Sequence, residues 1–334
     1  MSSDTILLSH GSGGKKSQEL LKFIYEILGD VVINHGEDSG VISIDMSCYA
    51  MTTDSYTIDP IFFPGGNIGK LAVCGTLNDL AMVGAVPEFI TLSLMIEEGF
   101  SFADLESIVR SISSELKKTS VKIIAGDTKI ISRGKIDKIF INTAGFGKVI
   151  ATNAISSINA QPGDSVIVTG SVGDHGSSIM AYRNGFSEGL RSDCANVAPL
   201  IQVLIEAGID VHTLRDPTRG GLASIMNEIA ESSGVSIELY EEKIPIRDSV
   251  NGVCDALGID PLYMACEGRA AIFVPEDQAK KVIEILSDNE LAKDVAIVGF
   301  VKEKSEKPKV YLRTYIGARR ILPLLSREQT PRIC

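Results

Sequence analysis

Residues 69–87, GKLAVCGTLNDLAMVGAVP, form an apolar run that closes with Gly84 and Pro87. Glycine and proline are common stop signals of a helix, so the run predicts a buried helix. Asp79 lies within it, although aspartate has poor helix propensity and a buried carboxylate is costly unless it is paired or bound to a metal ion. An acid standing alone in such a place could be only a cap or turn residue, so its interpretation depends on the rest of the chain.

Strands and helices are predicted on both sides of this run. The predicted strands lie within 41–55, 88–96, 121–129, 138–149, 165–176, 235–241, 270–274, 295–301 and 309–314. The other predicted helices span 17–28, 101–120, 197–208 and 222–234. Because strands and helices do not strictly alternate in either half, the pattern favours an α+β fold of two domains over one doubly wound sheet.

A break near 150–164, where NAQPGD (159–164) is rich in turn residues, predicts the boundary between the domains. We therefore expect an N-terminal domain at 1–150, a C-terminal α+β domain at 151–321 and a mobile tail at 322–334. The tail has no clean period, and Pro323 and Pro331 disfavour a helix there. Its last residue is Cys334.

The composition narrows the class of protein. The 334 residues are 44% apolar with a net charge of −11, which argues against non-specific nucleic-acid binding. The sequence shows no signal peptide and no apolar run of transmembrane length, so we expect a cytoplasmic protein that binds no membrane. The six cysteines form no C-x-x-C pair, which disfavours a zinc site or a disulfide framework.

Three further acids resemble Asp79 in their setting: Asp38, Asp54 and Asp127 each lie in or beside an apolar element, next to Gly, Thr or Ser. Several converging carboxylates suit a hard cation such as Mg²⁺. Lys129 and Glu267 also flank apolar strands, although each could be an ordinary surface or loop charge.

Two loops could hold an anion, but neither is a common nucleotide motif. In the loop RDPTRGG (215–221) the candidates are Asp216, Thr218 and Arg219, which could bind an anion or cap the next helix. The segment HGSGGKK (10–16) could offer backbone N–H groups to a phosphate. The Walker A spacing fails in both glycine-rich segments of the N-terminal half, so the residues alone make only a weak case for a Mg²⁺–phosphate enzyme.

Several blocks together resemble one family, and they are distributed over nearly the whole chain. They are LSHGSGGKKS (8–17), the long block TTDSYTIDPIFFPGGNIGKLAVCGTLNDLAMVGAVP (52–87), AGDTK (125–129), INTAGFGKV (141–149), GDHG (173–176), RDPTRGG (215–221), ACEGR (265–269) and PRIC (331–334). The chain is thereby similar to the HypE family, the carbamoyl dehydratases of [NiFe]-hydrogenase maturation. The wider superfamily includes aminoimidazole ribonucleotide (AIR) synthetase, selenophosphate synthetase and thiamine-monophosphate kinase.

The resemblance implies an AIR-synthetase-like homodimer in which the N-terminal halves share a β-barrel and ATP binds at the domain and subunit junction. Cys334 would accept a carbamoyl group from the carbamoyltransferase HypF, and the tail would return to its own active site. There ATP-dependent dehydration would convert the S-thiocarboxamide to an S-thiocyanate. The cyano group would then pass to iron on the HypC–HypD scaffold.

The resemblance also assigns roles to residues. Glu267 would be the base that takes the amide protons, and Lys129 would polarise the carbonyl oxygen or steady the phosphate. Mg²⁺ would be held by Asp38, Asp54, Asp79 and Asp127. The predicted ATP-binding residues are these four acids with Lys70, Gly126, Thr128, Asp216, Thr218 and Arg219.

Two other functions remain open at this stage. A phosphotransferase of the selenophosphate-synthetase type would want a reactive cysteine beside the N-terminal glycine loop, where this chain has Ser9-His10-Gly11 and no cysteine before Cys48. A non-catalytic nucleotide-binding adaptor would have no need for the acids together with Lys129 and Glu267.

Overall fold

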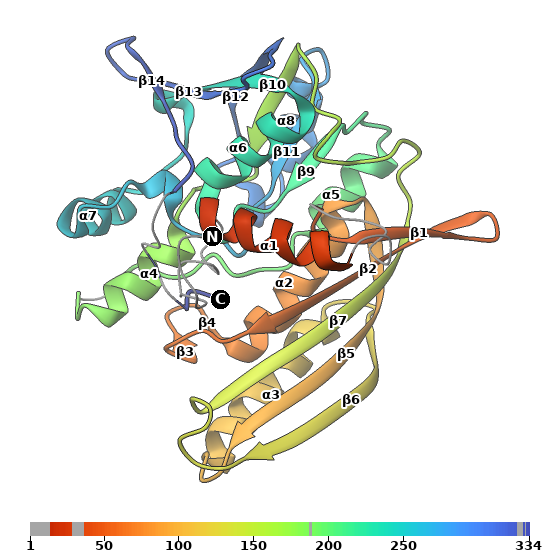
Figure 1. The fold of residues 1–334 in the computed structure, drawn as a ribbon, viewed down its shortest axis with the longest axis vertical. Coiled ribbons are helices and arrows are strands. Elements are labelled where there is room, and N and C mark those ends of the chain that lie inside the picture. The colour runs from red at the N-terminus through yellow and green to blue at the C-terminus, as the bar shows by residue number, and fades with distance from the viewer. Residues whose placement is uncertain (1–13, 29–36, 187–188, 326–329, 331) are drawn as a thin grey trace.

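The computed structural model describes residues 14–28, 37–186, 189–325, 330 and 332–334, and the predicted helix 69–87 lies at its centre as α2 (Ile68–Met82) (Figure 1). The helix begins where the side chain of Asn67 accepts hydrogen bonds from the backbone amides of Gly69 and Lys70. It ends just before Gly84, whose positive φ of 72° suits glycine. Nearly all of its residues are buried, because it packs between strands of one sheet and elements of the other.

The N-terminal part of the chain builds a five-stranded sheet in the order β1-β2-β7-β5-β6. These strands are β1 (Gly40–Ile44), β2 (Ser47–Tyr56), β5 (Ala85–Glu97), β6 (Lys122–Ile131) and β7 (Ile139–Val149). All neighbours are antiparallel except β5 and β6. Helix α3 (Phe102–Lys117) begins after Ser101, whose hydroxyl accepts a hydrogen bond from Asp104 N, and it shares a core with α2, β5 and β7. Strand β6 is left at the edge, with nine of its ten residues exposed.

The C-terminal part builds a seven-stranded sheet in the order β14-β13-β10-β12-β8-β11-β9. These strands are β8 (Asp164–Val168), β9 (Thr213–Arg215), β10 (Val235–Tyr240), β11 (Ala271–Pro275), β12 (Ala296–Lys304), β13 (Val310–Arg313) and β14 (Arg319–Ile321). Side chains of β8 alternate between two cores. Val166 and Val168 join the core of α6 (Gly221–Ser233), whereas Ile167 joins that of α5 (Ala198–Glu206) and α8 (Ala279–Leu286).

Smaller elements connect these layers. They are α1 (Lys15–Leu28), the β3 (Phe62–Phe63) and β4 (Gly66–Asn67) pair, α4 (Asp174–Arg183), α7 (Asp248–Leu257) and the short helices Glu241–Lys243, Pro261–Tyr263 and Glu290–Ala292. The predicted mixture of helices and strands is thus confirmed, while α4, α7 and α8 were not predicted. None of the helices in the described ranges has the length and apolar character that a membrane crossing requires.

Candidate active site

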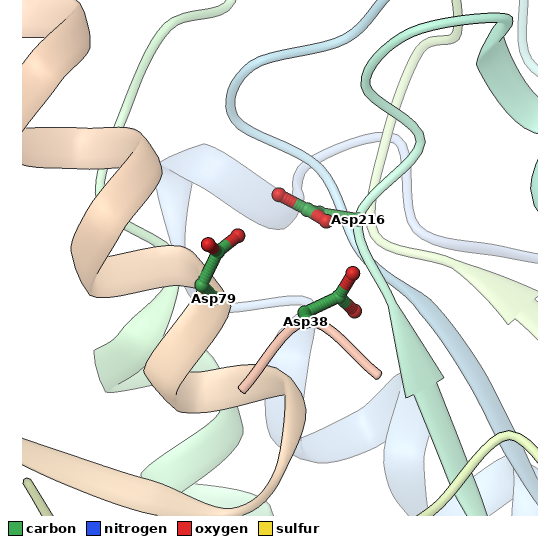
Figure 2. A group of neighbouring side chains, drawn as sticks. All are labelled: Asp38, Asp79 and Asp216. Atoms are coloured by element: carbon green, nitrogen blue, oxygen red, sulfur yellow. The ribbon is translucent and has the colours of Figure 1, made fainter. Parts of the chain in front are cut away.

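Three carboxylates from different parts of the chain meet beside α2 (Figure 2). Asp79 projects from α2, Asp38 precedes β1 and Asp216 follows β9, and an oxygen atom from each lies within 4.8 Å of the others. The hydroxyl of Thr52 on β2 joins two of them, because it donates to Asp79 Oδ2 at 2.8 Å and lies 3.0 Å from the backbone oxygen of Asp38. The fold therefore gathers acids that are far apart in sequence.

Burial and mutual repulsion dominate the electrostatics of these carboxylates. Burial and the charges of Asp54, Asp216 and Asp38 raise the pKa of Asp79 well above its ordinary value. Burial raises the pKa of Asp216 to about 6, and its Oδ2 atom is buried without a hydrogen-bond partner among the described residues. An acidic site with an oxygen left over in this way suits a divalent cation.

The Arg215 guanidinium lies on one side of this group of carboxylates. The Arg215 guanidinium lies 3.1 Å from Asp38 Oδ2 and 3.0 Å from Glu228 Oε2, and Asp38 nevertheless has a pKa raised well above its ordinary value because burial dominates. Neither Arg215 nor Glu228 was among the predicted site residues. Arg215 is the first residue of the RDPTRGG loop and Glu228 lies in the helix that follows it, and no motif singled out either residue.

The four predicted Mg²⁺-binding acids separate in the structure. Asp38 and Asp79 lie in the group with Asp216, which had been predicted only as an ATP-binding residue. Asp54 on β2 accepts a hydrogen bond from Tyr56 Oη at 3.0 Å, and burial raises its pKa. Its charge acts on Asp79, so it belongs to the same electrostatic site.

Asp127 lies elsewhere, on the exposed edge strand β6. Its side chain is 57% exposed and pairs at 3.2 Å with Lys129, which is 67% exposed. Gly126 and Thr128 share this exposed strand. Within one chain, β6 therefore presents its four predicted site residues to the surface.

The other predicted ATP-binding residues lie at the starts of helices. Lys70, in the first turn of α2, donates to the backbone oxygen of Gly65 at 3.1 Å. Thr218 and Arg219 form the turn that leads into α6, where the Thr218 backbone oxygen accepts from Gly221 N. The predicted glycine-rich segment 10–16 falls largely outside the described residues.

Glu267 is buried close to the acidic group. Its side chain is 3% exposed, and Oε1 has no hydrogen-bond partner among the described residues. Burial, followed by the charges of Asp216 and Asp193, raises its pKa well above the ordinary value. A raised pKa makes the ionised form of this carboxyl group a stronger base than an ordinary glutamate.

The described residues at the end of the predicted tail pack against the folded body, with Ile333 buried and Cys334 partly buried. Ile333 is 2% exposed and belongs to the core that contains α2 and α3. Burial raises the pKa of the Cys334 thiol to about 12, the positive charge of Arg219 opposes this shift, and Glu267 adds to it. The thiol and the two charged side chains thus share one electrostatic environment.

Backbone hydrogen bonds hold this part of the tail against residues 57–59. Thr57 N donates to the Cys334 oxygen at 3.1 Å, and Asp59 N donates to the Arg332 oxygen at 3.3 Å. The Arg332 side chain pairs with Asp137 Oδ2 at 2.6 Å. Residues 326–329 and 331 of the predicted tail lie outside the described residues, so its predicted mobility stays a prediction.

Comparisons with known proteins agree with this architecture. Residues 36–149 match the family model of the AIR synthase related protein, N-terminal domain, and residues 161–310 match that of the C-terminal domain. The fold and its site thus define an AIR synthase related protein.

More specific relatives cover nearly the whole chain. The carbamoyl dehydratase HypE of Escherichia coli is 40% identical over 99% of this chain and 100% of that protein. A solved structure of the hydrogenase maturation protein HypE in complex with ATP has a TM-score of 0.83 and 40% identity, covering 99% of this chain and 100% of that one. HypE from a HypE–HypF complex has a TM-score of 0.84 and 42% identity, covering 91% and 99%. The chain belongs to the HypE family.

Proposed function

We propose that this protein is a carbamoyl dehydratase that uses ATP to convert a carbamoyl group on Cys334 into a cyano group for the iron of [NiFe]-hydrogenase. The observation that carries the proposal is the placement of Cys334, which is partly buried and shares the electrostatic environment of Glu267 and Arg219. A carrier thiol inside the site makes its attached group an intramolecular substrate. The activity named for the E. coli relative supports the same reaction here.

The proposed reaction has two steps, a phosphoryl transfer and an elimination, and its atoms balance. The carbamoyl oxygen takes the γ-phosphoryl group of ATP, and ADP leaves. Loss of the two amide protons and of the phosphate, with cleavage of the C–O bond, then leaves S–C≡N, ADP and phosphate. Glu267 would take the amide protons, since its raised pKa makes its carboxylate a stronger base. Its buried position would also exclude water from a dehydration.

We further propose that Asp38, Asp79 and Asp216 hold Mg²⁺, with Asp54 and Asp127 as additional acids. The fit lies in three converging carboxylates, of which Asp216 keeps a buried, unpartnered oxygen among the described residues. The metal ion would neutralise the charge of the phosphates. Lys70, Gly126, Thr128, Thr218 and Arg219 would complete the ATP site.

The exposed residues of β6 support a homodimer. An edge strand with exposed apolar side chains is a ready surface for another chain, and Ile124 and Ile130 are 62% and 66% exposed. We propose that β6 packs in a β-barrel shared by two N-terminal domains, and that this brings Lys129 and Asp127 to the ATP site. Lys129 would then polarise the carbamoyl oxygen.

Three wider expectations form part of this proposal. The domains would divide at 1–150 and 151–321, and the tail at 322–334 would move between the site and its partners. HypF would load the carbamoyl group, as the complex of a HypE relative with HypF supports. The HypC–HypD scaffold would receive the cyano group in the cytoplasm.

The direct test is the mass of the peptide that contains Cys334. The protein is carbamoylated by its transferase and then incubated with or without ATP and Mg²⁺. We expect the carbamoyl adduct to lose the mass of one water only when ATP is present, and to persist in Glu267→Gln. Loss of water without ATP, or an adduct on another cysteine, would overturn the proposal.

A further inference from the structure

Two residues of α4 hold the buried end of the tail by its backbone. His175 Nε2 lies 2.8 Å from the Ile333 oxygen, and Arg183 Nη2 donates to the Arg332 oxygen at 2.8 Å. His175 has no exposed surface. The tail therefore meets two side-chain donors from α4, in addition to the backbone amides of residues 57–59 and the Thr57 hydroxyl, which lies 3.4 Å from the Cys334 oxygen.

The hydrogen bonds around His175 define its tautomer. A carbonyl oxygen can only accept, so Nε2 carries the proton that points at Ile333. Nδ1 then accepts from the Ser192 hydroxyl at 2.7 Å, and Ser192 Oγ accepts in turn from Cys194 N at 3.0 Å. The Phe63 ring packs nearly perpendicular to the imidazole, with centroids 5.4 Å apart. The imidazole is thus fixed in orientation as a neutral donor, and burial favours the neutral form by lowering its pKa.

Arg183 joins the tail to the segment that follows β2. Its Nε donates to the Asp59 oxygen at 2.8 Å, while Nη2 reaches the Arg332 oxygen. Asp59 N also donates to the Arg332 oxygen. One guanidinium therefore bridges the two backbones that lie side by side.

We infer that His175 and Arg183 are positioning residues that set the depth at which Cys334 enters the site, an inference that rests on the proposed function. Both bind backbone carbonyls at 333 and 332, and neither bond involves the thiol. The same two contacts can therefore hold the tail with a thiol, a thiocarboxamide or a thiocyanate at Cys334. A displacement of about 1 Å at a reacting group can cost about 100-fold in rate, so a fixed depth matters.

Thiol protection in the full chain tests this inference without relying on catalysis. Iodoacetamide labelling of Cys334 is followed by mass spectrometry, with the exposed Cys48 as an internal control. In His175→Leu and in Arg183→Ala we expect Cys334 to react about tenfold faster, as the loss of one hydrogen bond predicts, while Cys48 is unchanged. His175→Gln keeps an N–H donor and should restore much of the protection.

The outcomes separate positioning from folding and from the proposed activity. Unchanged labelling of Cys334 in both His175→Leu and Arg183→Ala would overturn the inference. The inference would also be overturned if Cys334 and the buried Cys266 were both labelled faster, and if this happened in His175→Gln as well. Such a result would show that the imidazole ring of His175 only supports the fold. If labelling changes as expected but the unaltered protein forms no cyano group, the proposed function fails while the inference stands. If both the inference and the proposed function hold, His175→Leu should lower the rate of cyano formation by a larger factor than it changes the affinity for ATP.

Discussion

The backbone amide of Glu267 donates a hydrogen bond to Asp193 Oδ1 at 3.2 Å, so an acid lies directly behind the proposed base. The Asp193 side chain is fully buried, with its other oxygen 3.7 Å from Arg269 Nε. After burial and Asp216, Asp193 is the next cause of the raised pKa of Glu267. The residue thus both anchors the loop of Glu267 and tunes its basicity.

Asp193→Asn should therefore shift the acid limb of the pH profile. A base must be ionised, so activity is lost as pH falls through the raised pKa of Glu267. Removing the Asp193 charge lowers that pKa, and the limb should move to lower pH. The measurement is ATP-dependent cyano formation from pH 5 to 9, with the exposed Asp288→Asn as the control. A limb that does not move, or that moves to higher pH, would contradict this account.

The acidic group makes a prediction about stability. When folding raises the pKa of an acid, ionising that acid is less favourable in the folded state than in the unfolded state. The stability of the protein therefore falls as the pH rises from the ordinary pKa to the raised one. For Asp216 this window runs from 3.8 to about 6, so the full cost is present above it. Asp79→Asn keeps an acceptor for Thr52 but removes one of the charges that repel Asp216. Without metal at pH 8 we expect its Tm to rise by roughly 1–3 °C and the stabilisation by Mg²⁺ to disappear.

The same variant tests the metal assignment through activity. Differential scanning fluorimetry with EDTA or Mg²⁺ gives the stability, and the exposed Asp277→Asn is the matched control. Asp79→Asn should lose ATP-dependent turnover while it stays folded. Full activity in a folded Asp79→Asn protein would show that the carboxylate is not needed to hold Mg²⁺.

Much of this arrangement could be predicted from the sequence, because strong local patterns determine it. The helix predicted in the apolar run 69–87 and the helix predicted at 101–120 both form, as α2 and α3. Helix α4 was missed, since its polar and apolar residues do not separate onto two faces and seven of its ten residues are buried. The role of His175 was missed for a different reason: its partner at Ile333 lies 158 residues away, and no local pattern reports such a contact.

The acids show the same limit. Family resemblance grouped Asp38, Asp54, Asp79 and Asp127, but resemblance does not report which chain or which face presents each side chain. The structure joins Asp216 to Asp38 and Asp79 through the turn after β9 and leaves Asp127 on an exposed edge. Burial raises the pKa values of Asp38, Asp79 and Asp216. This burial follows from tertiary packing and has no signature in the sequence.

The edge strand β6 gives a prediction about oligomeric state. Replacing Ile124 and Ile130 together with lysine should convert a dimer into a monomer, because buried charges would face an apolar surface in the shared barrel. Ile158→Lys is the matched control, since this side chain is 64% exposed in the C-terminal part of the chain. Light scattering over a range of concentrations measures the mass. A dimer that survives the double substitution would place the interface elsewhere.

The last prediction concerns the two states of the tail that the proposed carrier role requires. Inside the protein the Cys334 pKa is about 12, so the thiol is neutral and a poor nucleophile at pH 8. It can accept a carbamoyl group readily only after the tail leaves the site, where a free thiol has a pKa near 8.5. We therefore expect Cys334 to be labelled by iodoacetamide at least about tenfold more slowly than the exposed Cys48. Binding of the transferase should remove this protection before any group is transferred.

Cys334→Ala should accept no carbamoyl group and form no cyano product, yet bind ATP as the unaltered protein does, since the acids lie in the folded body. Cyano formation on another cysteine of Cys334→Ala would refute the carrier role.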